Sequence, residues 1–307
     1  MESARCAVAA WRLKSIVISL NIIGAGRLGR TLARLWTKNS VFKTQDVLTA
    51  HAASASAAVA FIGAGRAATE LDAMRAAAVW LLAPPDDRIA ACCAALAQSG
   101  LLKPGDIVFH CSGALSSRDL TQASARGAAV ASVHPLKSFA DPAAAAGTFA
   151  GTFCAAEGDA AALAVLRPAF ERIGARVSAI DPAAKTIYHA ASVLACNYLT
   201  ALLEAGVRCY EKAGFARADA LAMMEPLARE TLDNVFKLGP AKALTGPIAR
   251  GDEHVVARQL AALSAWDPQL AMIYKELGAV AVKLAREQGG AEAAALAAID
   301  RLLAGGR

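Results

Sequence analysis

The sequence predicts an α/β protein in which a doubly wound, mostly parallel sheet is followed by an all-helical C-terminal domain. Three observations support this fold class: short apolar segments alternate with helix-like segments over residues 1–180, a glycine-rich turn follows the first apolar segment, and residues 181–307 show only helical periodicity. A chain of 307 residues is long enough for two domains, so we expect a boundary between residues 180 and 181.

The expected strands are short, rich in apolar or β-branched residues, and bounded by turn residues. They are Ser15–Ile23, Asp46–Ala50, Ala78–Ala83, Ile107–Cys111, Ala129–Val133, Phe153–Ala156 and Arg176–Ile180. Ala78–Ala83 is apolar on both faces, which is typical of a central parallel strand. An alanine-rich helix is expected over Ser54–Ile62. Asp86 or Asp87 is expected to cap the helix that follows Pro84-Pro85.

The helical domain is expected to begin at Asp181-Pro182, because Asp is a good N-cap and Pro is favoured at the first helical position. The first helix runs to Ala213, with Gly214 as its stop, and is apolar on nearly all sides. Such a helix must be buried nearly all round, so we expect a homodimer through this domain. The other expected helices are Ala218–Leu238, Glu253–Ser264, Pro268–Gln288 and Ala291–Leu303.

Composition excludes several classes of protein. With 56% hydrophobic and 19% charged residues the chain is not disordered, and its net charge of +6 is dispersed, with no two basic residues adjacent, which argues against nucleic-acid binding. The apolar run Thr186–Leu203 includes His189, Asn197 and Tyr198, so we expect no membrane partner. Seven cysteines without a C-x-x-C pair, and no clean signal peptide in Met1–Lys14, favour a cytoplasmic protein.

The strongest motif is Gly24-Ala25-Gly26-Arg27-Leu28-Gly29, which follows a strand and opens a helix. In a dinucleotide-binding turn the first glycine permits the tight turn, the second lets the backbone approach a pyrophosphate, and the third lets the helix pack closely on the strand. The residues expected to bind the cofactor here are Gly24, Gly26, Arg27, Leu28 and Gly29. The near-copy beginning at Gly63 follows a helical segment instead, so Gly63 is interpreted as a helix stop.

The end of the second strand bears on the choice between NAD and NADP. NAD sites usually place an acidic residue about 20 residues beyond the fingerprint, where it binds the ribose 2′-hydroxyl. Thr49–Ser54 contains no acid, and Asp46 lies too early in the strand. An uncharged strand end accepts a 2′-phosphate better than a carboxylate would, and Ser54, Ser56 and Arg27 are candidates to contact it. We therefore expect NADP, with NAD as the alternative.

Polar side chains follow two of the expected strands. Ser112 comes after the strand that begins at Ile107, and His134 comes after the strand that begins at Ala129. Because ligands of doubly wound sheets bind beyond the carboxyl ends of the strands, we expect the nicotinamide near Pro84, Ser112 and His134.

The start of the long helix should face these strand ends. Lys185 and His189 are four residues apart and share a helix face, and Asn197 lies on the flank of that face. Lys185 or His189 would protonate the product and Asn197 would orient the substrate. The structural alternatives are a solvated lysine, a core histidine and an asparagine in a helix contact. No metal is expected, because the histidines lack metal-ligand spacing.

Several motifs occur in a fixed order: the glycine-rich turn, His110-Cys-Ser-Gly-Ala-Leu115, Ser132-Val-His-Pro-Leu-Lys137, Lys185-x-x-Tyr-His189, Asn197-Tyr-Leu199 and Leu244-Thr-Gly-Pro-Ile-Ala-Arg-Gly-Asp252. This combination resembles a bacterial family of oxidoreductases that joins a Rossmann-like NAD(P) domain to a C-terminal helical domain of unknown function. It is more distantly similar to pyrroline-5-carboxylate reductase and 6-phosphogluconate dehydrogenase-like enzymes. The resemblance implies a helical dimerisation domain and hydride transfer at an interdomain cleft. Relatives often carry Arg-Ser near the end of the second strand, and this chain does not.

These observations lead to a functional hypothesis. We expect a cytoplasmic, NADP-dependent oxidoreductase that transfers a hydride between nicotinamide and a C=O or C=N bond of a small, anionic molecule. The alternative is a dinucleotide-binding sensor or scaffold without turnover. Close-set polar side chains around the nicotinamide would favour the enzyme, and an apolar or occluded pocket would favour the sensor.

Overall fold

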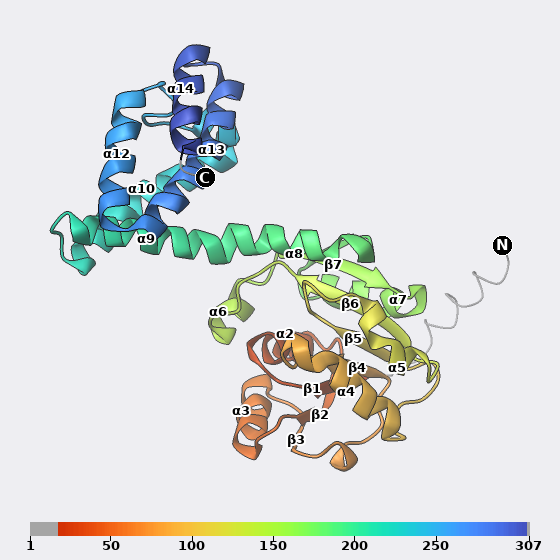
Figure 1. Cartoon of the computed structure of the whole chain (residues 1–307). Helices are drawn as coiled ribbons and strands as arrows, with labels where there is room; N and C mark the ends of the chain where they lie inside the picture. The colour runs from red at the N-terminus through yellow and green to blue at the C-terminus, as the bar shows by residue number, and fades with distance from the viewer. Residues whose placement is uncertain (1–17, 306–307) are drawn as a thin grey trace, which may run out of the picture. The chain divides into compact units, whose positions relative to one another are not determined.

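The computed structural model describes residues 18–305, so the segment Met1–Lys14 and the expected start of the first strand at Ser15 lie outside the described residues. Contacts divide the chain into two compact units, with the boundary between Ala195 and Cys196. The first unit holds an eight-stranded sheet with helices around it, and the second consists of helices and loops (Figure 1). The predicted fold class is confirmed.

The strands of the first unit form one sheet in the order β3-β2-β1-β4-β5-β6-β7-β8. Their bounds are β1 Ser19–Ile23, β2 Lys43–Leu48, β3 Arg66–Ala68, β4 Val79–Leu82, β5 Ile107–His110, β6 Ala129–Pro135, β7 Phe153–Gly158 and β8 Arg176–Ala179. All neighbours pair in parallel except β6 and β7. Strand β3 was missed in the sequence, because three residues at a sheet edge, two of them exposed, give no readable alternation.

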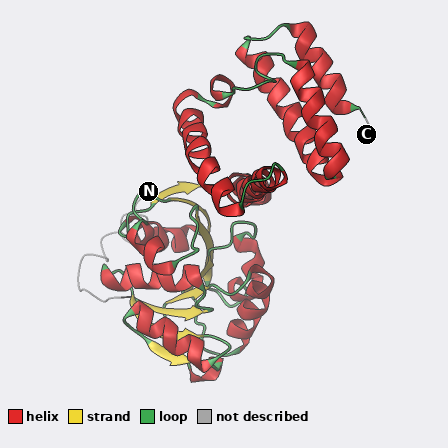
Figure 2. Cartoon of the chain, turned by 90° about the vertical axis from the view of Figure 1, so that its left-hand side faces the viewer, coloured by secondary structure: helices red, strands yellow, loops and turns green. Residues whose placement is uncertain are grey.

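Helices cover both faces of this sheet (Figure 2). Their bounds are α2 Arg27–Lys38, α3 Ala52–Ile62, α4 Asp86–Gln98, α5 Thr121–Ser124, α6 Pro142–Gly147, α7 Ala160–Glu171 and α8 Lys185–Val193. Short 3₁₀ turns lie at η2 Leu71–Ala73, η3 Ser117–Leu120 and η4 Pro182–Ala184. Helices α2, α3 and α7 pack on one face, and α4 and α5 pack on the other. This two-sided burial explains why β4 and β5 are apolar throughout or nearly so.

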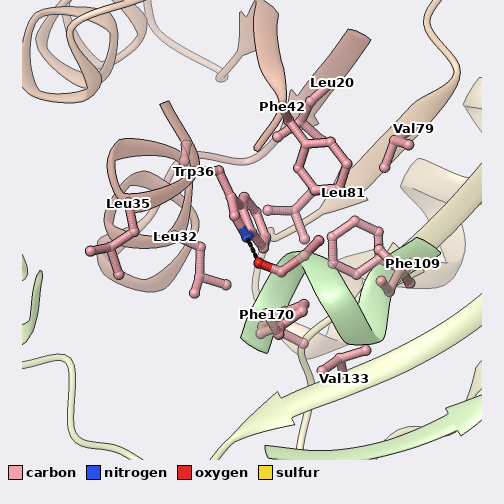
Figure 3. Close-up of a cluster of buried hydrophobic side chains, with 14 of the residues drawn as sticks. Leu20, Leu32, Leu35, Trp36, Phe42, Val79, Leu81, Phe109, Val133 and Phe170 are labelled. Carbon is pink, nitrogen blue, oxygen red and sulfur yellow. Dashed lines mark hydrogen bonds between the residues drawn. The ribbon is translucent and has the colours of Figure 1, made fainter. Parts of the chain in front are cut away.

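The larger of the two cores centres on Trp36 of α2, which is fully buried (Figure 3). Its ring makes edge-to-face contacts with Phe42, Phe109 and Phe170 at centroid distances of 5.4, 6.2 and 5.2 Å. The indole Nε1 donates a hydrogen bond to the Ala169 carbonyl at 3.1 Å, so its polar atom is satisfied. These contacts fix the position of α2 against the sheet, and therefore also the position of the glycine-rich turn that precedes α2.

The long apolar helix begins as predicted, since the Asp181 carboxylate accepts a hydrogen bond from the Ala183 amide. It continues through α8, a π-helical segment at Leu194–Tyr198 and α9 at Leu199–Lys212, and ends beside Gly214, which has a φ of 100°. The unit boundary falls within the π-helical segment, so the start of this helix belongs to the first unit. The predicted boundary lies earlier, where the helix begins.

One helix in the described part of the chain, Pro182–Lys212, is long and apolar enough to cross a membrane by length and composition. The same test is passed by apolar core helices of soluble proteins, and only 6% of its most apolar window is buried within the single chain. The expectation of no membrane partner rests on the polar residues inside this helix and stays a prediction.

The second unit is built from α9 and five further helices. Their bounds are α10 Arg217–Leu238, α11 Pro240–Ala243, α12 Glu253–Trp266, α13 Pro268–Gln288 and α14 Ala293–Ala304. Its core is small and lies where α12, α13 and α14 meet around Val256, Val282 and Leu296. Much of the remaining apolar surface of this unit is exposed, including Phe236 at 86%.

Candidate active site

The three glycines of the turn between β1 and α2 have different surroundings. Gly24 has a φ of 85°, and a Cβ there would collide with the backbone of Ala83 and Pro84. A Cβ at Gly29 would lie 3.0 Å from the Gly24 carbonyl oxygen. A Cβ at Gly26 would meet no protein atom within 4 Å, so this position opens onto free space at the N-terminus of α2. The first and third glycines therefore build the turn, and the second leaves room beside it.

That free space is part of a cavity of about 790 Å³ at the carboxyl ends of β1, β2, β4 and β5. The sheet order reverses between β1 and β4, which is where doubly wound folds bind ligands. Pro84 and Ser112 line one part of the cavity, and Thr49 and Ala50 line the part at the end of β2. The lining also includes Leu28, the basic residues Arg27 and Arg88, and the acidic Asp86.

Asp46, the acidic residue nearest to the end of β2, forms ion pairs within the protein. Asp46 is fully buried and accepts hydrogen bonds from Arg66 Nε at 3.0 Å and Arg75 Nη2 at 2.8 Å. Burial alone would raise the pKa of Asp46, but the hydrogen bonds from Arg75 and Arg66 outweigh it and hold the pKa below its usual value. Thr49 and Ala50 leave the cavity uncharged at this end. Ser54 is exposed in the first turn of α3 and does not line the cavity.

Ser112 organises the turn that follows β5. Its Oγ accepts hydrogen bonds from the amides of Ala114 at 3.2 Å and Leu115 at 3.0 Å, and donates to Asp86 Oδ2 at 2.7 Å. Asp86 therefore does not cap α4, and neither does Asp87: the N-cap is Pro85, without a side-chain hydrogen bond. The predicted cap was wrong because both aspartates lie inside the helix, where Asp86 serves as the acceptor for Ser112.

Gly113 is the point where two imidazoles converge. A Cβ on Gly113 would collide with Nδ1 of His189 and would lie 2.9 Å from Nε2 of His134. The two rings pack edge to face at a centroid distance of 5.7 Å. Nδ1 of His189 is buried and has no hydrogen-bond partner within the described part of the chain. A glycine is needed here because both ring edges approach its Cα.

Tyr188 is the hydrogen-bond partner of His134. Its Oη lies 3.0 Å from His134 Nδ1, and burial raises the pKa of Tyr188 to about 12, so the hydroxyl keeps its proton and can donate to Nδ1 or accept from it. The other ring nitrogen, Nε2, faces Gly113. Burial, followed by the charges of Lys185 and His189, lowers the pKa of His134 to about 4, against a smaller opposite effect of Asp86. His134 is therefore neutral at neutral pH.

Lys185 is not solvated, although it is the first residue of α8. Its side chain is 1% exposed, and Nζ donates hydrogen bonds to the Ser112 carbonyl at 3.0 Å and to Ser132 Oγ at 2.5 Å. Oε1 of Glu157 lies 3.9 Å from Nζ. Burial lowers the pKa of Lys185, and the charge of Glu157 opposes this shift. The amine is thus enclosed by oxygen atoms of residues that lie on β6 and β7 and directly after β5.

The structure brings four of the predicted site residues together around one turn: Ser112, His134, Lys185 and His189. The fifth, Asn197, is exposed in the π-helical segment and belongs to the second unit. Sequence reasoning missed Glu157 as a member of the site. An acid inside the otherwise apolar strand β7 is the signal that could have revealed it. Within residues 18–305 there is no cluster of three or more His, Cys, Asp or Glu side chains that could hold a metal ion.

The sheet order, the glycine-rich turn and the cavity at the switch point define the first unit as a Rossmann-type nucleotide-binding fold. Residues 5–135 match the Rossmann-like domain family, and residues 152–281 match the family described as domain of unknown function DUF2520. The chain therefore joins a Rossmann-like domain to a DUF2520 domain, which confirms the family resemblance of its motifs.

No curated protein matches the sequence. Among solved structures, protein TM1727 from Thermotoga maritima is 26% identical with a TM-score of 0.68, and the match covers 88% of this chain and 99% of that one. A candidate NADP oxidoreductase from Bacteroides fragilis is 20% identical with a TM-score of 0.71, covering 86% and 98%. The pyrroline carboxylate reductase of Plasmodium falciparum, solved with NADP bound, is 13% identical with a TM-score of 0.57, covering 93% and 98%. The last two matches establish the fold.

Proposed function

We propose that this protein is an NADP-dependent oxidoreductase that transfers a hydride between nicotinamide and a C=O or C=N bond of a small, anionic molecule. The observation that carries the proposal is the Ser112–Gly113 turn. Ser112 lines the cavity next to the glycine-rich turn, and Gly113 supports two imidazole edges that carry proton-transfer atoms. A nucleotide cavity and proton-transfer groups thus meet at consecutive residues.

The residues of the cavity fit a dinucleotide. The free space at Gly26, next to the N-terminal amides of α2, suits a pyrophosphate, and Arg27 adds a positive charge. The strand end at Thr49 and Ala50 carries no carboxylate that would repel a 2′-phosphate, which favours NADP over NAD. When bound, the cofactor would supply the hydride and Pro84 would line its nicotinamide end. We keep Ser54 as a proposed contact of the 2′-phosphate, although its side chain lies outside the cavity lining.

The proton of the reaction is assigned to His189. Its Nδ1 is buried and makes no hydrogen bond within the described part of the chain, so no described protein group competes with a substrate oxygen or nitrogen for a proton there. Nε2 of His134 lies beside the same glycine and is proposed to hydrogen-bond to that substrate atom. Lys185 is the less suitable donor because its amine is enclosed by protein acceptors. Asn197 is proposed to orient the substrate.

An anionic substrate agrees with the charge of the chain. The net charge is +6, and Arg88 joins Arg27 in the cavity lining. Dispersed positive charge attracts small anions without forming a track for nucleic acid.

The function is tested with the full chain, purified without added cofactor. Fluorescence titration is expected to give an NADPH affinity at least about tenfold above that for NADH. A panel of small oxo-acids and cyclic imino-acids is then expected to contain a compound that drives NADPH oxidation, and His189→Asn is expected to abolish turnover while NADPH still binds. NADPH binding without turnover across the panel would favour the sensor instead, and absence of NADPH binding would refute both.

The protein is also expected to be a homodimer through its helical part, residues 181–307. The apolar run Thr186–Leu203 lies in a helix of which only 6% of the most apolar window is buried in the single chain, and Leu227 and Phe236 of α10 are 57% and 86% exposed. A stable dimer would cover such surface with an interface of about 2,000 Å² or more. Light scattering at sub-micromolar concentration should give twice the 31.5 kDa chain mass.

Phe236→Asp is expected to weaken that dimer. The matched control is Phe153→Asp, which changes an exposed phenylalanine of the first unit and should leave the dimer intact. A folded wild-type monomer at sub-micromolar concentration would contradict the dimer.

A further inference from the structure

Lys185 and Glu157 form a buried pair of opposite charges that ties together several elements of the first unit. Lys185 is 1% exposed and Glu157 is 4% exposed. Lys185 begins α8, whereas Glu157 lies on β7, directly opposite Ser132 of β6 in the antiparallel register. Because Ser132 Oγ also accepts a hydrogen bond from Lys185, the amine is fixed from both strands.

Glu157 is itself held in place. Its two carboxylate oxygens accept hydrogen bonds from the amide of Ser117 at 2.8 Å and from Ser117 Oγ at 2.6 Å. Ser117 begins the short helix η3, a few residues after the Ser112–Gly113 turn. The loop from Ser112 to Ser117 is therefore held at both ends: Lys185 binds the Ser112 carbonyl, and the Glu157 carboxylate binds Ser117.

This arrangement bears on the two imidazoles. Between the residues that the pair holds, Gly113 packs against the edges of His134 and His189 with no room for a side chain. Moving the turn would open or close that contact. The positive charge of Lys185 also contributes to the lowered pKa of His134.

We propose that Lys185 and Glu157 act as a charged clamp that fixes the Ser112–Gly113 turn against His134 and His189, so that Lys185 is a positioning residue and not the proton donor. This role rests on the proposed function in one respect: the proposed function is what assigns the two imidazoles to the substrate. The amine donates two hydrogen bonds to the protein, to the Ser112 carbonyl and to Ser132 Oγ, and the carboxylate of Glu157 lies beside it at 3.9 Å. An amine so occupied is held by the protein and is not directed at a ligand.

The pKa of His134 distinguishes the charged clamp from a purely structural role of Lys185, because a purely structural role would leave this pKa unchanged. The charged or titratable groups that face it are Lys185, Tyr188 and His189 from α8 and Asp86 from α4. Burial is the largest cause of its lowered pKa, and the positive charge of Lys185 is the next. Removing that charge should therefore raise the pKa of His134 even if the ring stays buried.

The experiment is an NMR titration of the histidine ring carbons in the full chain without cofactor. The chain has five histidines, and His134→Asn assigns the signal. In the double variant Lys185→Met with Glu157→Gln, which leaves no unpaired charge, the pKa of His134 is expected to rise by about one unit or more. Lys185→Arg keeps the charge and should keep the low value. The control Lys103→Met changes an exposed lysine before β5, at the opposite end of the strands.

Lys185→Gln with Glu157→Gln is the second variant, for use if the first double variant does not fold, because it too leaves no unpaired charge and keeps polar groups at both positions; it is expected to raise the same pKa. Amide exchange at Ser112 and Gly113 should quicken in both neutral variants. An unchanged His134 titration together with unchanged exchange would overturn the clamp. Because these measurements need no cofactor, that failure is distinct from a failure of NADPH binding, which would refute the proposed function and leave the clamp standing.

Discussion

Replacing Gly26 with valine is expected to lower NADPH affinity by at least about 100-fold, or about 3 kcal/mol, while the protein remains folded. Gly26 has a φ of −63° and a ψ of −171°, a conformation that any residue adopts, and a Cβ there meets no protein atom within 4 Å. The added side chain would instead occupy the space assigned to the pyrophosphate. Fluorescence titration with NADPH measures the loss, and circular dichroism checks the fold.

The control is Gly63→Asn, in the second glycine-rich segment. Gly63 is the left-handed C-cap of α3, which confirms its interpretation as a helix stop, and asparagine tolerates that conformation. This variant should bind NADPH as the wild type does. Gly65 is a poorer control, since its φ of 97° and the nearby Thr44 make any side chain strained. Equal affinity in Gly26→Val and the wild type would refute the proposed pyrophosphate site.

Glu157→Gln is expected to reduce the free energy of unfolding by about 3 kcal/mol near neutral pH, because it leaves the buried amine of Lys185 without its opposite charge. Burial favours the neutral amine, so the folded protein binds fewer protons than the unfolded chain as pH approaches the ordinary lysine pKa. Stability must then rise with pH over that interval. The deficit of Glu157→Gln should accordingly shrink toward pH 10. Urea unfolding at several pH values measures it.

Combining Glu157→Gln with Lys185→Met should restore part of the lost stability, because neither charge is left unpaired. The sum of the two single losses should therefore exceed the loss in the double variant. Additive losses would show that the two side chains do not interact, and would leave the hydrogen bonds of Lys185 to Ser112 and Ser132 as its main contribution.

Local sequence determined the fold class and the nucleotide-binding end of the site. The glycine-rich turn was recognisable because each glycine has a local reason: a positive φ at Gly24, open space at Gly26 and close packing at Gly29. The apolar strands β4 and β5 and the Asp181-Pro182 helix start were readable for the same reason. These features depend on residues that are close in the chain or on the regular spacing of apolar residues along a strand or helix.

The sequence also placed Ser112 and His134 at strand ends and Lys185 and His189 on one helix face, which is enough to predict that they lie close together. The structure agrees in placement, but their catalytic roles remain proposals. The sequence left Lys185 and His189 equal as proton donors. Their difference appears only in three dimensions, because Nζ of Lys185 meets acceptors on β6 and β7 while Nδ1 of His189 meets none.

Tertiary structure alone decided which polar groups are satisfied. Glu157 had no motif, and its partner Ser117 lies 40 residues earlier in the chain. The hydrogen-bond partner of His134 is Tyr188, 54 residues away, and Asp86 proved to be an acceptor for Ser112 and not a helix cap. The physical reason is that backbone conformation responds mainly to local residue types, whereas burial, charge pairing and hydrogen-bond partners depend on which distant segments the fold brings together.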